Sequence, residues 1–87
     1  MNYQDIIVYD FETTGVNPYR CQPIQLGAVC IHGRKLEIHP NSYFCSFIKP
    51  IFDVEQCEKL GLDPVNDEVL NKTGIKMEDL ENAPSIR

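Results

Sequence analysis

The fold of this chain is decided by DIIVYDFETTG, residues 5–15. The stretch from Asp5 to Asp10 is a short, nearly continuous apolar run rich in β-branched residues, a pattern typical of a strand covered on both faces. Residues 13–18, TTGVNP, then carry the Gly and Asn-Pro of a loop. The pattern predicts a first strand that ends in acidic residues.

Asp10 and Glu12 are the candidate catalytic and metal-binding pair. In an extended chain, residues i and i+2 project to the same face roughly 6.5 Å apart, whereas Phe11 between them is expected to turn into the core. Two carboxylates at the end of a strand are hard oxygen ligands of the kind that Mg²⁺ or Mn²⁺ prefers. The alternative is that Asp10 and Glu12 are ordinary solvated residues beside a loop, which is the commoner meaning of an isolated D-x-E.

Two more strands are predicted before any helix. The sequence IQLGAVCI over Ile24–Ile31 predicts a second strand, and residues 32–35, HGRK, predict the turn after it. The aromatic-rich SYFCSFI over Ser42–Ile48 predicts a third strand, which Pro50 limits. The second strand follows at a distance that allows antiparallel pairing with the first.

The second part of the chain is predicted to form short helices. Its apolar residues recur at helical spacing at Val54, Cys57, Leu60, Val65, Val69 and Leu70. Pro64 suits the first turn of a helix capped by Asp63, and Gly74 suits its end. Met77–Leu80 predicts one further turn, and residues 83–87 predict the opening of another helix.

Five blocks of this sequence, in order, resemble the DEDD-type (DnaQ-like) 3′-5′ exonuclease family of the ribonuclease H-like superfamily. They are IVYDFETTG at 7–15, PIQLGAV at 23–29, FIKP at 47–50, TGIKMEDL at 73–80 and NAPSI at 82–86. The resemblance covers nearly the whole chain, but the chain covers only the amino-terminal half of the family's domain. It implies a partial ribonuclease H-like α/β fold, in which residues 1–87 form a truncated domain with three strands of a mixed sheet followed by short helices.

The resemblance also implies roles for the first acidic motif. The family uses four acidic residues, of which only Asp10 and Glu12 are matched here. Asp10 would bridge two divalent metal ions, Mg²⁺ or Mn²⁺, and Glu12 would hold the one that carries the attacking water. Thr13, Thr14 and Gly15 would lie near the terminal nucleotide of the substrate. Because the later acids are missing, we expect this chain alone to be inactive.

Other residues depart from the family pattern or stay outside it. Gln25 stands where many members have Glu, and the stretch Asp53–Leu62 is longer than usual, so we interpret it as a loop insertion. The family's general base is a histidine of the last motif. His32 and His39 lie beside the predicted hairpin turn instead, so we interpret them as surface or turn residues.

The sequence predicts the amino-terminal part of a metal-dependent 3′-5′ exonuclease that hydrolyses terminal phosphodiester bonds of DNA or RNA. Its partners would be single-stranded or 3′-end nucleic acid and a second polypeptide that supplies the missing half of the domain. A first alternative is a non-catalytic half-fold that serves as a binding or assembly module completed by a partner chain. A second is a structural domain in which the acidic motif is coincidental.

Composition limits these functions only in part. The net charge of -5 and pI of about 4.8 weigh mildly against a domain that holds nucleic acid by phosphate contacts alone, but bound cations can compensate. The four cysteines lack metal-ligand spacing, which favours free thiols in a reducing cytoplasm. No apolar run is long enough to span a membrane.

Overall fold

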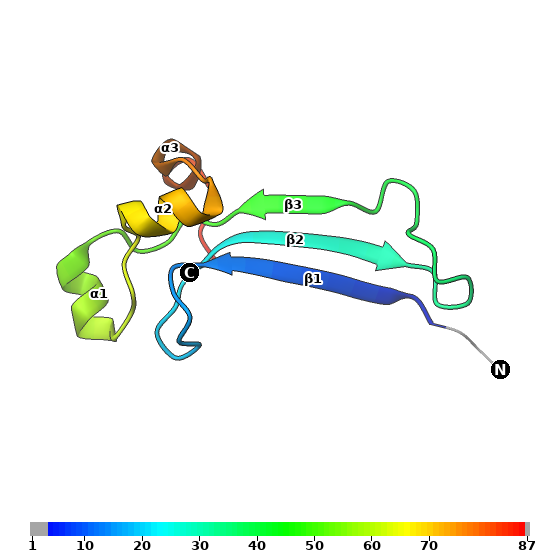
Figure 1. Ribbon diagram of the computed structural model, residues 1–87, viewed down its shortest axis with the longest axis horizontal. Coiled ribbons are helices and arrows are strands. Elements are labelled where there is room, and N and C mark those ends of the chain that lie inside the picture. The colour runs from blue at the N-terminus through cyan, green and yellow to red at the C-terminus, as the bar shows by residue number, and fades with distance from the viewer. Residues whose placement is uncertain (1–3, 87) are drawn as a thin grey trace.

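A three-stranded antiparallel sheet extends from one end at which three short helices gather (Figure 1). This computed structural model describes residues 4–86. The strands are β1 (Ile6–Thr13), β2 (Pro23–Ile31) and β3 (Phe44–Phe47), in the spatial order β1-β2-β3. The sheet reaches well beyond the helices, so the molecule measures 53 × 25 × 23 Å.

All three predicted strands are present, and β1 is longer than predicted. It continues past Asp10 to Thr13 because pairing with β2 continues, with Asp10 opposite Gly27 and Glu12 opposite Gln25. The register shifts only between Glu12 and Thr13, where the strand gives way to the loop. The acidic motif therefore lies inside the paired strand and has a rigid backbone.

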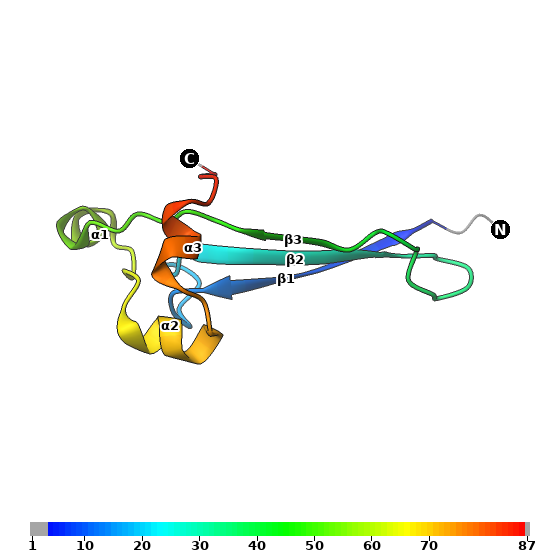
Figure 2. The same cartoon turned by 90° about the horizontal axis from the view of Figure 1, so that it is seen from above.

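The expectation that β1 is covered on both faces is wrong for this chain. Ile7 is 62% exposed and Tyr9 is 64% exposed. Phe11 does not turn into a core but is 43% exposed, and its ring packs edge-on against Tyr9 at 5.8 Å between centroids. The physical reason is that the helices gather beyond one end of the sheet (Figures 1 and 2), so no described element covers β1.

Helix α1 (Val54–Leu60) occupies the stretch interpreted as a loop insertion. Asp53 caps it by accepting a hydrogen bond at 2.9 Å from the backbone N–H of Gln56. Gly61 ends it in the left-handed conformation, with φ of 70°. The segment Asp53–Leu62 therefore has defined secondary structure, and the prediction of helical spacing there is confirmed.

Helix α2 (Asp67–Thr73) begins later than predicted. Its N-cap is Asn66, whose side chain accepts a backbone N–H of the first turn, and not Asp63; Pro64 lies before the helix. Asn is as good a cap as Asp, and two acidic residues follow Asn66 in the first turn, where they favour the helix dipole. The predicted end at Gly74 is confirmed.

Helix α3 (Met77–Glu81) confirms the further turn, but the opening of another helix does not appear. Residues 83–86 are non-helical, because this segment lies beside the chain that leaves β3, where Lys49 donates its N–H to the carbonyl of Pro84 at 2.9 Å. Arg87 is outside the described residues. No helix among residues 4–86 is long and apolar enough to cross a membrane.

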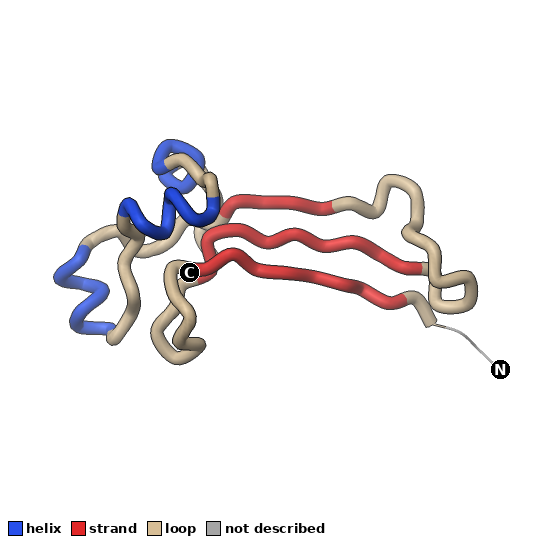
Figure 3. Tube along the Cα trace, in the orientation of Figure 1, coloured by secondary structure: helices blue, strands red, loops and turns tan. Residues whose placement is uncertain are grey.

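The hydrophobic core lies where the helices meet the end of the sheet (Figures 2 and 3). Its buried residues are Ile24, Ile75 and Leu80. Partly buried residues from β3, the loops and α2 pack around them: Phe47, Phe52, Val65, Val69 and Leu70. The four cysteines are free thiols, as predicted, so no disulfide supplements this small core.

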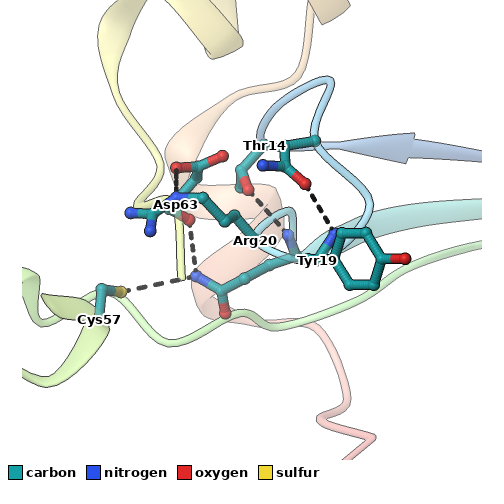
Figure 4. A network of polar contacts seen from close by, with 7 residues as sticks. Thr14, Tyr19, Arg20, Cys57 and Asp63 are labelled. Atoms are coloured by element: carbon teal, nitrogen blue, oxygen red, sulfur yellow. Dashed lines mark hydrogen bonds and ion pairs between the residues drawn. The ribbon is translucent and has the colours of Figure 1, made fainter. Parts of the chain in front are cut away.

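A buried glutamine joins the sheet to the segments around α1. Gln22 is 1% exposed, and its amide nitrogen donates to the carbonyls of Ile51 and Asp63, each at 3.1 Å. Its amide oxygen accepts the N–H of Ile51 at 2.9 Å. The Sγ of Cys57 lies 3.6 Å from the same nitrogen, and Figure 4 shows Cys57 and Asp63 converging on this network. One side chain thus satisfies several buried backbone groups.

We expect Gln22→Leu to lower the free energy of unfolding by about 3 kcal/mol, because it leaves buried backbone groups of Ile51 and Asp63 without partners. Urea unfolding followed by circular dichroism measures this. Gln56→Leu, an exposed change of the same kind on α1, is the control and should change stability by less than about 0.5 kcal/mol. Equal losses in both variants would contradict the role assigned to Gln22.

Candidate active site

Asp10 and Glu12 lie on one face of the sheet, as predicted. Each stands opposite a β2 residue without a bulky apolar side chain, namely Gly27 and Gln25. Both acids line a shallow hollow of about 140 Å³ that Gln25, Gly27 and Cys45 complete. The bare backbone at Gly27 keeps the flank of Asp10 open, so both carboxylates are accessible from the same side.

Neither carboxylate has a protein partner within residues 4–86. Among these residues no hydrogen bond or ion pair involves the side chain of Asp10 or Glu12, although other acids, such as Glu68 with Lys72 at 3.0 Å, are paired. Two negative groups side by side with free oxygen lone pairs form a donor set that suits a hard divalent cation. The residues present therefore fit a metal such as Mg²⁺ or Mn²⁺.

A larger hollow of about 460 Å³ begins at Glu12 and runs between the loop after β1 and helix α2. The loop contributes residues 13–16, and α2 contributes Glu68, Val69, Lys72 and Thr73. One wall thus has backbone and hydroxyl groups, and the wall opposite has the aliphatic side chain of Val69 beside the ion pair of Glu68 with Lys72. Glu12 of the acidic pair lies at one end of the hollow.

Thr13 and Thr14 shape this loop from within. Thr14 is buried, its N–H donates to the carbonyl of Gln22 at 3.0 Å, and its hydroxyl oxygen accepts the N–H of Gln22 at 2.8 Å. The hydroxyl of Thr13 donates to the carbonyl of Gly15 at 2.7 Å. The loop is therefore held in place before any substrate binds. The roles of Thr13, Thr14 and Gly15 toward a nucleotide stay a prediction.

Gly15 lies where this loop closely approaches the segment before α2. A Cβ at Gly15 would lie 2.5 Å from Oδ2 of Asp63. Asp63 is fixed by Arg20, whose Nε lies 3.2 Å from Oδ1 and whose carbonyl accepts the Asp63 N–H at 2.8 Å (Figure 4). Asp63 therefore belongs to the wall of the hollow, whereas the sequence indicated only a helix cap.

The wall formed by α2 was missed by sequence reasoning. Asn66, Val69 and Lys72 line the hollow, but Val69 was used only to predict a helix, and Asn66 and Lys72 were given no functional role. The signal that could have identified them is position, because they directly precede the TGI block that the family resemblance already included.

The two histidines lie away from the acidic pair. His39 Nε2 is 3.2 Å from Oδ2 of Asp5, and this contact holds the pKa of the Asp5 carboxyl below its usual value. The His32 and His39 rings lie 5.2 Å apart beside the hairpin turn. Neither histidine lines a hollow that contains Asp10 or Glu12, so neither is placed to act on a substrate there.

Comparison with known protein families gives a match over residues 7–87 to the family described as RNase_T, Exonuclease. This chain belongs to the RNase T exonuclease family. The match includes β1 with its acidic pair, the loop after it and α2. A search of curated proteins finds no significant match. The resemblance to DEDD-type exonucleases is confirmed.

Solved exonuclease structures share the fold of this family member. A full-length 3′-exonuclease has a TM-score of 0.72 and 20% identity over 99% of this chain and 26% of its own. Cell-death related nuclease 4 has a TM-score of 0.70 and 20% identity, over 95% of this chain and 26% of its own. The nuclease domain of 3′hExo, a DEDDh family member bound to rAMP, has a TM-score of 0.68 and 21% identity, over 95% of this chain and 38% of its own. The chain thus spans well under half of each structure, and its sheet and helices are the amino-terminal part of that fold.

We expect the Asp10→Asn/Glu12→Gln variant of this exonuclease family member to be as stable as the unmodified chain without metal, because it removes a like-charge pair with no protein partner. Added Mg²⁺ should raise the thermal unfolding midpoint of the unmodified chain and not that of the variant. Differential scanning calorimetry measures both effects.

The matched control is Glu58→Gln/Glu81→Gln, which removes the same charge at exposed helix positions. It should retain the Mg²⁺ effect. An equal Mg²⁺ effect in all three proteins would show that the cation acts on general charge and not on the Asp10 and Glu12 pair.

Proposed function

We propose that this chain supplies the first part of a metal-dependent 3′-5′ exonuclease site that hydrolyses terminal phosphodiester bonds of DNA or RNA. One observation carries the proposal: two unpaired carboxylates, Asp10 and Glu12, share a sheet face, and Glu12 lies at the end of a hollow large enough for a nucleotide. Membership of the exonuclease family supports it.

Asp10 and Glu12 are the residues of this chain that would hold the metal ions. Two Mg²⁺ or Mn²⁺ ions, when bound, would activate a water and neutralise charge on the leaving oxygen. Each carboxylate offers two oxygens, and no described cationic side chain is paired with either acid. Bound cations would also offset the net charge of -5, which otherwise repels phosphate.

The hollow beside Glu12 is proposed to hold the terminal nucleotide. Its volume of about 460 Å³ falls within the range of roughly 300–1,000 Å³ that is common for small-molecule sites. The aliphatic side chain of Val69 offers a surface for the base. The amino group of Lys72 would contact phosphate by exchanging its exposed partner Glu68, 3.0 Å away, for the phosphate. The preorganised loop with Thr13, Thr14 and Gly15 would orient the sugar.

The two later acids and the histidine base of the family have no counterpart in this chain. We infer that they come from the rest of the exonuclease domain, in the same polypeptide or in a second one. Without them the metals lose most of their ligands, so residues 1–87 bind a nucleotide but do not turn it over. Residues 1–87 are accordingly proposed to be an incomplete exonuclease domain.

A second candidate function is a binding or assembly module that a partner chain completes. The exposed apolar side chains of Ile7 and Tyr9 favour it, as does the edge of β1 that no described strand occupies. This candidate requires tight binding of a second polypeptide, whereas the exonuclease proposal requires metal-dependent binding of a nucleotide.

We expect AMP to bind the chain in the presence of Mg²⁺, and at least about tenfold more weakly to Asp10→Asn/Glu12→Gln, because the metal joins the phosphate to these carboxylates. Isothermal titration measures the affinity, with Glu58→Gln/Glu81→Gln as the control. A parallel assay with a 3′-labelled single-stranded oligonucleotide should show no release of nucleotides by the chain alone.

Equal AMP binding by the chain and the Asp10→Asn/Glu12→Gln variant would count against the exonuclease site and favour the assembly module. Nucleotide release by the chain that the double substitution abolishes would show that self-association supplies the missing acids.

A further inference from the structure

Three side chains with metal-binding chemistry meet at the end of the sheet that lies away from the helices. They are Asp5, Cys30 and His39, and their ligand atoms all lie within 4.8 Å of one another. Asp5 precedes β1 and Cys30 lies near the end of β2. His39 lies in the loop before β3, and its N–H donates to the carbonyl of Cys30 at 2.9 Å. Sheet pairing therefore brings together three segments that are distant in sequence.

This cluster is separate from the acidic pair. Cys30 stands opposite Ile7 in the register, and side chains alternate along a strand, so Cys30 and Asp10 point to opposite faces of the sheet. Asp5 and Asp10 are also about 17 Å apart along the strand at about 3.4 Å per residue. The proposed exonuclease site and this cluster cannot share a ligand.

The ring of His39 has an unsatisfied nitrogen within the cluster. Its Nε2 is buried and has no hydrogen-bond partner among the described residues. Oδ2 of Asp5 is 3.2 Å away, so this contact has the distance but not the geometry of a hydrogen bond. A buried polar atom without a partner is unfavourable. A cation between His39 and Asp5 would satisfy both atoms.

We propose that Asp5, Cys30 and His39 form a zinc-binding site. Imidazole nitrogen, thiolate sulfur and carboxylate oxygen together are a donor set that suits Zn²⁺. Bond lengths to Zn²⁺ imply ligand atoms roughly 3.4–3.6 Å apart in a tetrahedron, so small side-chain rotations close the site. Binding releases the thiol proton of Cys30 to solvent, and a water takes the fourth position.

His32 lies close by but is not the fourth ligand. Its Nδ1 accepts the backbone N–H groups of Arg34 and Lys35, each at 3.3 Å. These two hydrogen bonds hold the His32 ring in the hairpin turn. The ring lies 5.2 Å from that of His39. His32 is therefore a matched control for His39. Cys21, a free thiol that lines neither the hollows beside the acidic pair nor this cluster, is the matched control for Cys30.

A bound Zn²⁺ would stabilise the end of the sheet at which no hydrophobic core forms. The core residues all lie at the helical end, whereas here the strands are held by sheet pairing, the hairpin turn and polar contacts such as those of Ser42 with Cys30. The backbone of Gln4 approaches the turn so closely that a Cβ at Gly33 would collide with the carbonyl oxygen of Gln4. This packing keeps Asp5 beside the turn, so the carboxylate is positioned before the metal arrives.

Titration of the metal-free chain with Co²⁺, a spectroscopic substitute for Zn²⁺, tests the proposal. We expect a thiolate-to-cobalt charge-transfer band at one equivalent, which Zn²⁺ then removes. Cys30→Ser should abolish the band, and His39→Gln should weaken binding at least about tenfold, whereas His32→Gln and Cys21→Ser should retain it. Absence of the band in the unmodified chain, or equal loss in the control variants, would overturn the zinc site.

A second measurement does not depend on the folding of any variant. The unmodified chain is alkylated with iodoacetamide with and without Zn²⁺, and the modified cysteines are identified by mass spectrometry. Zn²⁺ should slow alkylation of Cys30 at least about tenfold and leave Cys21 unchanged. Equal protection of both thiols, or protection of neither, would refute the assignment. Neither outcome bears on the exonuclease proposal, which rests on Asp10 and Glu12.

Discussion

The antiparallel pairing of β1 with β2 determines where the acidic pair and Cys30 of this chain lie. Its register sets Asp10 opposite Gly27 and Glu12 opposite Gln25, so two carboxylates share one face. The same register sets Cys30 opposite Ile7 and so places it on the other face. A slip of one residue would exchange the faces of all β1 side chains relative to β2. Strand register, more than any loop, is therefore the constraint on which the acidic site depends.

Stability is distributed unevenly along this sheet. At one end, three buried apolar residues and the amide of Gln22 tie the strands to the helices and to the loop after β1. That loop carries Thr13 and Thr14 and forms a wall of the nucleotide-sized hollow. The acidic pair thus lies next to the best-anchored part of the chain. The opposite end has only backbone pairing and the small polar cluster around His39.

Much of this arrangement could be predicted from the sequence. Alternation along DIIVYDFETTG places Asp10 and Glu12 on one face, and Gly74 marks the end of α2, because both depend on local chemistry. The predicted start of α2 was wrong because Asp63 and Asn66 are both good N-cap residues and only tertiary contacts decide between them. The predicted burial of Phe11 was wrong. An apolar strand indicates that other segments cover its faces, but the strand alone does not identify those segments.

Clusters of residues that only the tertiary structure brings together could not be predicted from the sequence. The spacing of the cysteines gave no indication that Cys30 would meet a histidine and an aspartate, since the three come from different segments. Asp63 as a wall of the hollow likewise depends on how the segment after α1 returns to the loop at Gly15. Such contacts follow from the path of the chain and not from a local pattern.

The edge of β1 that no described strand occupies belongs to the same strand that carries Asp10 and Glu12. A strand that pairs there gains the backbone hydrogen bonds of that edge and at the same moment brings its own side chains alongside the two acids. Closure of the sheet and completion of the proposed metal site would then be a single event. Under the proposed function, a molecule whose sheet is not yet complete would also lack a complete metal site and would not hydrolyse nucleic acid.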